Sequence, residues 1–147
     1  MRKLNINTLI SIVVPVYNES GVVEIFIARI ISILENIDHK YEIIFINDGS
    51  TDDTFAELEK VYKAHKNIRV ITFSRNFGKE AAISAGIDYS HGDALIPIDI
   101  DLQDPPELII NFIKFWQDGY DVVYGIRKDR SLDSVGKRIT SRLFYAV

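Results

Sequence analysis

The residues most capable of chemistry lie where an apolar segment gives way to carboxylates. Residues 94–98 are apolar and predict a buried strand, and Asp99, Asp101 and Gln103 follow at alternating positions. In an extended segment, residues two apart project to the same side, so the carboxylates of Asp99 and Asp101 share one small volume. A cation relieves the repulsion between two such acids, and carboxylate and amide oxygens suit Mg²⁺ or Mn²⁺. The pattern therefore predicts a divalent-cation site with Asp99, Asp101 and Gln103 as ligands.

Two further acids, Asp104 and Glu107, surround the expected start of the next helix at Pro106. Negative charge is stabilised at the positive end of a helix, so we expect these two carboxylates to be solvated groups near the helix start. The same argument does not account for Asp99 and Asp101, because they directly follow the apolar strand.

The rest of the chain alternates between strand and helix patterns. Runs rich in β-branched residues predict strands, and helical spacing of apolar residues predicts helices between them, the first along residues 22–37. We expect Ser50 to cap the second helix, and the small residues of the third helix, over 81–86, to let it approach the sheet closely. The predicted strands are residues 10–17, 41–46, 67–73, 94–98 and a short fifth strand at 121–125.

This alternation predicts an α/β fold with a doubly wound, mostly parallel sheet flanked by helices. In such a sheet the carboxyl ends of all strands lie at one edge, and ligands bind there where the strand order reverses. Polar residues end each of the first four strands, so we expect them to converge on one crevice. They are Tyr17 and Glu19 after the first strand, Asp48 after the second, Arg75 to Lys79 after the third, and Asp99 to Gln103 after the fourth.

Lys79 predicts an anion contact in this crevice. It lies in the first turn of a helix opened by Gly78, where a cation is disfavoured unless an anion neutralises it, and free backbone N–H groups there suit phosphate. A metal site beside an anion pocket indicates a nucleoside diphosphate. The sequence contains no GxxxxGK[ST] loop, GxGxxG fingerprint or GxSxG elbow, which argues against a P-loop NTPase, a dinucleotide dehydrogenase and a serine hydrolase.

Composition limits the class of protein further. The 147 residues are 47% hydrophobic and contain no cysteine, which predicts one domain over residues 1–147 with a real core and no disulfide or thiolate metal site. No signal peptide or apolar run of membrane-spanning length occurs, so this chain alone is expected to be soluble. Residues 127–142 carry six bases against two acids, a local charge of +4 that suits phosphate or an anionic membrane surface.

Four stretches of the chain resemble the family 2 glycosyltransferases of the polyprenyl-phosphate branch, the group of dolichol-phosphate mannosyltransferase and bactoprenol glucosyltransferase. They are residues 13–19 (VVPVYNE), 47–52 (NDGSTD), 74–79 (SRNFGK) and 99–107 (DIDLQDPPE), with a further match at 124–127. The likeness implies a Rossmann-like nucleotide-diphospho-sugar transferase (GT-A) fold. It also implies a nucleotide-sugar-binding part at 8–125, and a basic acceptor loop with the start of an interface helix at 126–147.

The resemblance also implies roles for individual residues. Pro15, Tyr17 and Glu19 would line the base pocket, Asp48 would contact the base or ribose, and Lys79 would contact the phosphates. Asp99 and Asp101 form the Asp-x-Asp motif, Asp101 and Gln103 being the best metal ligands and Asp99 lying nearer the sugar nucleotide. Arg127 and Arg130 would hold the phosphate of a lipid acceptor. Asn47 stands where the family more often has Asp.

By this likeness the chain is part of a metal-dependent, inverting hexosyltransferase that uses Mg²⁺ or Mn²⁺ and a UDP- or GDP-linked sugar. The acceptor would be a polyprenyl (undecaprenyl or dolichyl) phosphate at the cytoplasmic face of the membrane, in cell-envelope glycan synthesis, with no nucleic-acid partner. Family members continue beyond this length, so a truncated chain is implied. The alternatives are a saccharide acceptor and a non-catalytic nucleotide-sugar-binding module. A haloacid dehalogenase-type phosphatase or a receiver domain would place its acids after other strands.

Overall fold

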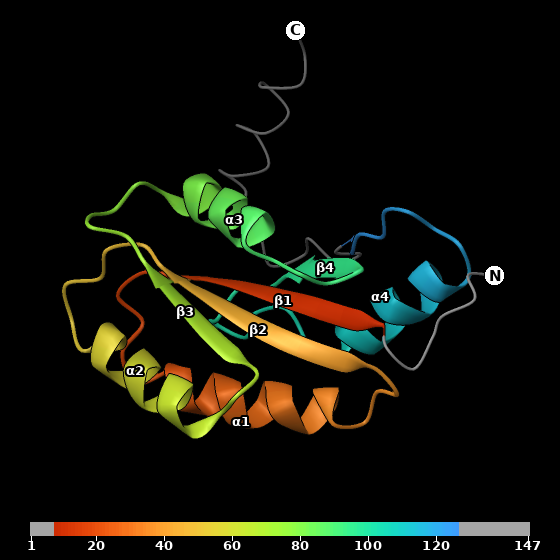
Figure 1. Cartoon of the computed structure of the whole chain (residues 1–147), viewed down its shortest axis with the longest axis horizontal. Helices are drawn as coiled ribbons and strands as arrows, with labels where there is room; N and C mark the ends of the chain where they lie inside the picture. Colours follow the sequence, from red (N-terminus) through yellow and green to blue (C-terminus); the bar gives the residue numbers. More distant parts are fainter. Residues whose placement is uncertain (1–7, 127–147) are drawn as a thin grey trace, which may run out of the picture.

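The computed structural model describes residues 8–126 and shows a four-stranded parallel sheet with helices on both faces (Figure 1). The chain runs outward from the first strand to the third and then returns to the other side of the first, giving the order β3-β2-β1-β4. The order therefore reverses between β1 and β4, the position at which doubly wound sheets bind ligands. The elements are β1 (Leu9–Val16), α1 (Val23–Leu34), β2 (Lys40–Asn47), α2 (Thr54–Ala64), β3 (Ile68–Thr72), α3 (Lys79–Asp88), β4 (Ala94–Pro97) and α4 (Leu108–Gln117).

Alternate residues of β1 enter two separate cores, because successive side chains of a strand point to opposite faces. Ile12 and Val14 belong to the larger core, to which α1, α2 and α4 contribute, whereas Val13 belongs to a smaller core beneath α3. Figure 1 shows α3 on one side of the sheet and α1 and α2 on the other. The predicted doubly wound parallel sheet is thus confirmed.

Helix α3 approaches the sheet closely, as its small residues predicted. Ala82 is fully buried against the sheet, and a Cβ added at Gly86 would collide with the side chain of Val13. This close approach brings the N-terminal turn of α3 near the carboxyl ends of the strands. Positioning of the Lys79 turn therefore depends on the lack of bulk along this helix.

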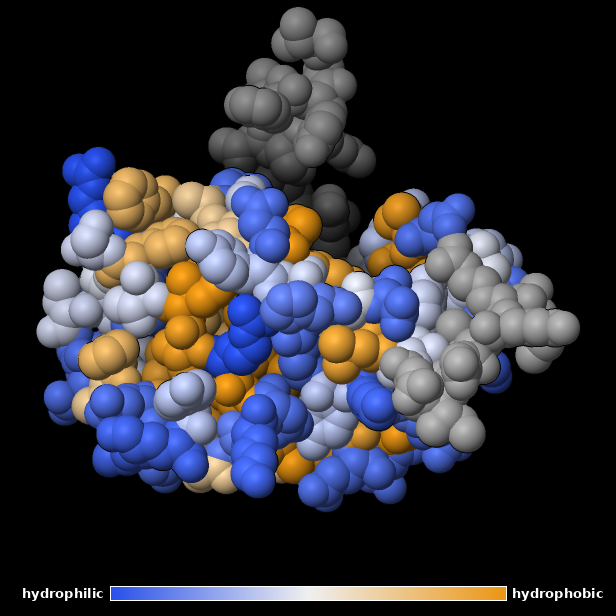
Figure 2. Space-filling view, in the orientation of Figure 1, coloured by the Kyte–Doolittle hydropathy of each residue, from blue (hydrophilic) through white to orange (hydrophobic). Residues whose placement is uncertain are grey.

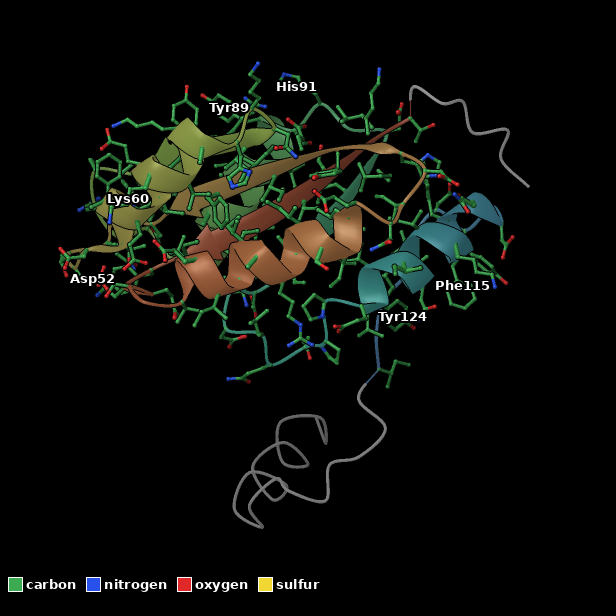
Figure 3. All side chains as sticks on the ribbon, turned by 90° about the horizontal axis from the view of Figure 1, so that it is seen from below. Asp52, Lys60, Tyr89, His91, Phe115 and Tyr124 are labelled. Atoms are coloured by element: carbon green, nitrogen blue, oxygen red, sulfur yellow. The ribbon has the colours of Figure 1, made fainter. Side chains whose placement is uncertain are left out.

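A buried polar network lies on the α3 face of the sheet, toward the amino ends of the strands. The Glu42 carboxylate on β2, 8% exposed, accepts hydrogen bonds from the Ser11 hydroxyl at 2.7 Å, from the His91 backbone N–H at 2.7 Å and from the Arg69 guanidinium at 3.2 Å. Burial alone would raise the pKa of Glu42, but these three donors bring it below its usual value. Arg69 also donates to the carbonyl of Tyr89 at 2.8 Å. Tyr89 and His91 lie together, well away from Asp52 (Figure 3).

The two outer strands of the described sheet are incompletely covered. β3 pairs only with β2, and Figure 2 shows apolar side chains gathered over this strand within a mostly hydrophilic face. β4 pairs only with β1, and of its four residues only Ile96 is buried. The prediction of a fully buried fourth strand was therefore wrong, because its burial depends on neighbours that its own sequence does not specify.

Two further local predictions were wrong. Residues 121–125 do not form the predicted strand. Val122 and Tyr124 are 79% and 75% exposed, and an apolar run forms a strand only where a neighbouring strand accepts its hydrogen bonds. Ser50 does not cap α2. Its hydroxyl accepts from the Asn18 backbone N–H at 3.0 Å, since the helix begins four residues later, at Thr54.

Several predicted boundaries moved by a few residues. Helix α1 ends at Leu34 rather than at residue 37, and α4 begins at Leu108, two residues after Pro106. Glu107 occupies the N-cap position of α4 without a side-chain cap, and its carboxylate pairs instead with Arg29 at 2.9 Å. Within the part of the chain that is described, no helix combines the length and apolar character needed to cross a bilayer.

Candidate active site

A cavity of about 280 Å³ lies at the carboxyl ends of β1, β2 and β4, beside the first turn of α3. Most of the polar groups predicted at the ends of these strands meet there, which confirms the expected convergence for them, but Gln103 does not line this cavity. The predicted site residues that line this cavity are Pro15, Tyr17, Glu19, Asp48, Lys79, Asp99 and Asp101.

The loop after β1 presents a half-buried carboxylate to the cavity. The backbone N–H of Glu19 donates to the Thr54 hydroxyl at 2.8 Å, and Thr54 is fully buried at the start of α2, which fixes the loop. Burial raises the pKa of Glu19, and the negative charges of Asp101 and Asp52 raise it further. Tyr17 is 45% exposed at the cavity wall, where an aromatic ring is available for stacking.

Asp48 organises the loop that leads into α3, a role that the sequence did not reveal. Its carboxylate is 3% exposed and accepts hydrogen bonds from the backbone N–H groups of Phe77 at 2.7 Å and Gly78 at 2.9 Å. Gly49 has φ +68°, and a Cβ there would lie 2.6 Å from the Arg75 Cα. The backbone of this loop therefore packs directly on the end of β2. The N–H groups of Phe77 and Gly78, which precede the helix, therefore donate to Asp48.

Lys79 and Asp99 form an ion pair across the cavity. The Lys79 Nζ lies 2.6 Å from Oδ1 and 2.7 Å from Oδ2 of Asp99, so the ammonium contacts both carboxylate oxygens. The two side chains are 57% and 42% exposed. No sequence pattern indicates this pair, because its members are twenty residues apart and come together only through the packing of α3 on the sheet.

The carboxylate oxygens of Asp99 and Asp101 are of the kind that a hard divalent cation prefers as ligands. Asp99 already holds a cation, the Lys79 ammonium, against its oxygens, and Asp101 is exposed to the cavity. Among residues 8–126, no three His, Cys, Asp or Glu side chains are grouped closely enough to bind a metal by themselves. The backbone N–H of Gln103 donates to the Asp101 carboxylate at 3.1 Å, and the role of Gln103 as a ligand stays a prediction. Arg127 and Arg130 lie outside the described residues.

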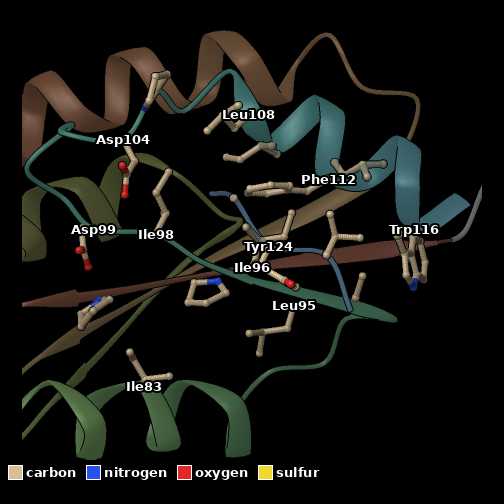
Figure 4. A pocket seen from close by; sticks show the side chains of 18 of the residues that line it. Ile83, Leu95, Ile96, Ile98, Asp99, Asp104, Leu108, Phe112, Trp116 and Tyr124 are labelled. Carbon is tan, nitrogen blue, oxygen red and sulfur yellow. The ribbon is translucent and has the colours of Figure 1, made fainter. Parts of the chain in front are cut away.

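A second, larger hollow of about 930 Å³ adjoins the first and shares Pro15, Lys79 and Asp99 with it. It lies between β4 and α4 and is mostly apolar. Figure 4 shows Ile96, Phe112 and Trp116 along this groove, with Asp99 and Asp104 at one end. The acidic cavity thus opens directly onto an apolar surface at Asp99.

The parallel sheet, its strand order and the helices on both faces match the GT-A fold that the sequence predicted. Solved structures confirm the fold. A mannosyltransferase from Pyrobaculum calidifontis, in complex with GDP-Man and Mn²⁺, matches 75% of this chain and 32% of its own at TM-score 0.65 and 21% identity. A glucosyl-3-phosphoglycerate synthase from Mycobacterium tuberculosis, in complex with UDP, matches 94% of this chain and 50% of its own at TM-score 0.63 and 22% identity.

The chain belongs to glycosyl transferase family 2, whose model matches residues 11–146. It is 48% identical over 138 residues to a protein of Synechocystis sp. described as an uncharacterized glycosyltransferase, covering 94% of this chain and 43% of that protein. It is 45% identical over 136 residues to the bactoprenol glucosyl transferase of Shigella phage SfV, covering 92% of this chain and 44% of that protein. The chain thus spans less than half the length of these relatives.

Proposed function

We propose that this chain is the donor-binding part of an inverting glycosyltransferase that moves a sugar from a UDP- or GDP-linked donor to a polyprenyl phosphate. The observation that carries the proposal is the convergence of seven predicted site residues on one cavity at the switch point of the sheet. The relatives named bactoprenol glucosyl transferase support the choice of a lipid phosphate as acceptor.

In this proposal the cavity binds the nucleotide end of the donor. Pro15, Tyr17 and Glu19 line the base pocket, and Tyr17 offers an exposed ring for stacking. Asp48 contacts the base or ribose while keeping the loop before α3 in place. Lys79 leaves Asp99 and contacts the diphosphate, which carries more negative charge than a single carboxylate.

A divalent cation, Mg²⁺ or Mn²⁺, would be held by Asp99, Asp101 and Gln103, and as a Lewis acid it would stabilise charge on the departing nucleoside diphosphate. The cavity itself argues for such a cation. Among residues 8–126, four carboxylates line it, those of Glu19, Asp48, Asp99 and Asp101, against the single ammonium of Lys79. A diphosphate entering this surplus of negative charge needs further positive charge beside it.

The acceptor in this scheme needs no general base. A lipid monophosphate, with a second pKa of about 6, is already anionic at pH 7, so its oxygen can attack the anomeric carbon directly. A new C–O bond forms at one face while the bond to the nucleoside diphosphate breaks at the other, which inverts the configuration. Arg127 and Arg130 orient the acceptor phosphate, because the planar guanidinium matches its oxygens, and the basic segment 127–142 holds the site near an anionic membrane face.

Calorimetry of this chain with UDP or GDP tests donor binding, each in the presence and absence of Mn²⁺. We expect metal-dependent binding of at least one nucleotide, and a loss of at least tenfold in affinity in Asp101→Ala. The matched control is Asp88→Ala, which removes the same charge from an exposed position at the far end of α3. Failure of both nucleotides to bind with Mn²⁺ would refute the proposal.

The acceptor is tested separately on the full-length protein. Transfer of labelled sugar to undecaprenyl phosphate in detergent, with no transfer to a saccharide, supports a lipid acceptor. Transfer to a saccharide alone identifies the other family 2 activity, and nucleotide binding without transfer to either identifies a binding module.

A further inference from the structure

The ion pair between Lys79 and Asp99 occupies one of the two carboxylates that we propose as ligands of the cation. The ammonium lies within 2.7 Å of both Asp99 oxygens, so a divalent cation approaching Asp99 would meet a positive charge already in contact with both of them. Asp101 is then the one carboxylate of the motif without the Lys79 ammonium. No group of three His, Cys, Asp or Glu side chains that could bind a metal exists in residues 8–126, at the motif or away from it.

We propose that Lys79 is the resident counter-ion of Asp99 and that the donor diphosphate releases Asp99 by taking Lys79 over, so that donor and divalent cation bind as coupled events. This inference rests on the proposed function and adds to it that Lys79 couples donor binding to cation binding. Lys79 is then a positioning residue with two partners, Asp99 in the free protein and phosphate in the donor complex.

The geometry makes the exchange of partners feasible. Lys79 lies in the first turn of α3, whose backbone N–H groups and dipole attract an anion to the same place. Both side chains of the ion pair are more than two-fifths exposed, and ion pairs exposed to water contribute little binding free energy. A diphosphate offers Lys79 more negative charge than one carboxylate does, so its arrival favours the exchange.

The charges of the cavity make the coupling reciprocal. A cation arriving alone meets the Lys79 ammonium at Asp99, and a diphosphate arriving alone meets four carboxylates. Each ligand removes the obstacle to the other, and linkage requires that each raise the affinity of the other by the same factor. Coupling between bound ligands commonly reaches about 5- to 150-fold, and we expect at least about tenfold here.

Electron paramagnetic resonance of free Mn²⁺ measures the coupling directly. In the unaltered chain we expect UDP or GDP to raise Mn²⁺ affinity at least about tenfold. In Lys79→Gln we expect tighter Mn²⁺ binding without nucleotide, because Asp99 is released, and a smaller rise on adding nucleotide. The control is Lys60→Gln on α2, which removes the same charge away from the cavity and should leave Mn²⁺ binding unchanged.

Removing Lys79 could tighten Mn²⁺ binding in two ways, by freeing the Asp99 carboxylate or simply by removing a positive charge from the cavity. Asp99→Asn, made alone and together with Lys79→Gln, distinguishes the two. With Lys79 present, we expect Asp99→Asn to change Mn²⁺ affinity little. In the double variant with Lys79→Gln, we expect Asp99→Asn to abolish the tighter Mn²⁺ binding that Lys79→Gln produces alone. Equal losses on Asp99→Asn in both backgrounds would overturn the inference, as would unchanged Mn²⁺ affinity in Lys79→Gln. These outcomes are read without nucleotide, so they are distinct from failure of UDP and GDP to bind, which would overturn the proposed function.

Discussion

Removing the Asp48 carboxylate should loosen the loop before α3 and lower the stability of the whole domain. The carboxylate is nearly fully buried and accepts two backbone hydrogen bonds, from Phe77 and Gly78. A hydrogen bond to a charged group contributes about 1.5 to 3 kcal/mol, and the freed N–H groups are only partly recovered by water. We expect Asp48→Ala to lower the free energy of unfolding by about 3 kcal/mol, a fall in Tm of about 10 °C for a chain of this size.

Asp48→Asn should cost less, about 2 kcal/mol, because the amide keeps one acceptor oxygen but turns a donor toward the second N–H. Urea unfolding followed by circular dichroism measures both variants, with Asp53→Asn as the control. Asp53 is exposed at the N-cap of α2 and its side chain makes no cap hydrogen bond, so we expect a change below about 0.5 kcal/mol. The measurement is made without nucleotide, which separates the loop from any donor contact. Asp48→Ala unfolding within 1 kcal/mol of the unaltered chain would refute this account of the loop.

Two further predictions concern the α3 face of the sheet. The pKa of Glu42 is lowered in the folded protein, so its contribution to stability is present above the unfolded value near 4.5 and is lost as the pH falls through the folded value. Glu42→Gln should therefore cost about 2 kcal/mol at pH 7 and progressively less below pH 4.5, and a pH-independent difference in urea unfolding would contradict this. Gly86→Ala should destabilise by about 1 to 3 kcal/mol despite better helix propensity, because the methyl group collides with Val13. Adding Val13→Ala should recover part of that loss, and simple additivity in the double variant would argue against the contact.

The predicted positions of the site residues depended on few assumptions. Strong apolar periodicity fixed four strands and four helices to within a few residues, and the parallel order followed from their alternation. Once the sheet is parallel, Tyr17, Asp48 and Asp101 must lie at one edge. The functional roles of the individual residues, including Arg127 and Arg130 outside the described range, stay predictions.

The errors share one physical cause. Whether residues 121–125 form a strand, and whether β4 is buried, depends on which chain segments lie beside them rather than on their own residues. The Ser50 hydroxyl had two possible partners, a helix start and the neighbouring loop at Asn18, and only the packed loops selected the second. Local propensity does not decide between partners that are distant in sequence.

The sequence by itself determined the four strands of the described sheet, the helices between them and the acids that follow the strands, because these depend on the spacing of apolar residues and on breaks within a few positions. Only the tertiary structure decided which charges neutralise one another. Asp48 binds the loop before α3 and Lys79 binds Asp99 because close packing of α3 on β1 brings together groups that lie twenty or more residues apart. Electrostatic and hydrogen-bonding partners are chosen by distance in space, and sequence spacing does not record that distance.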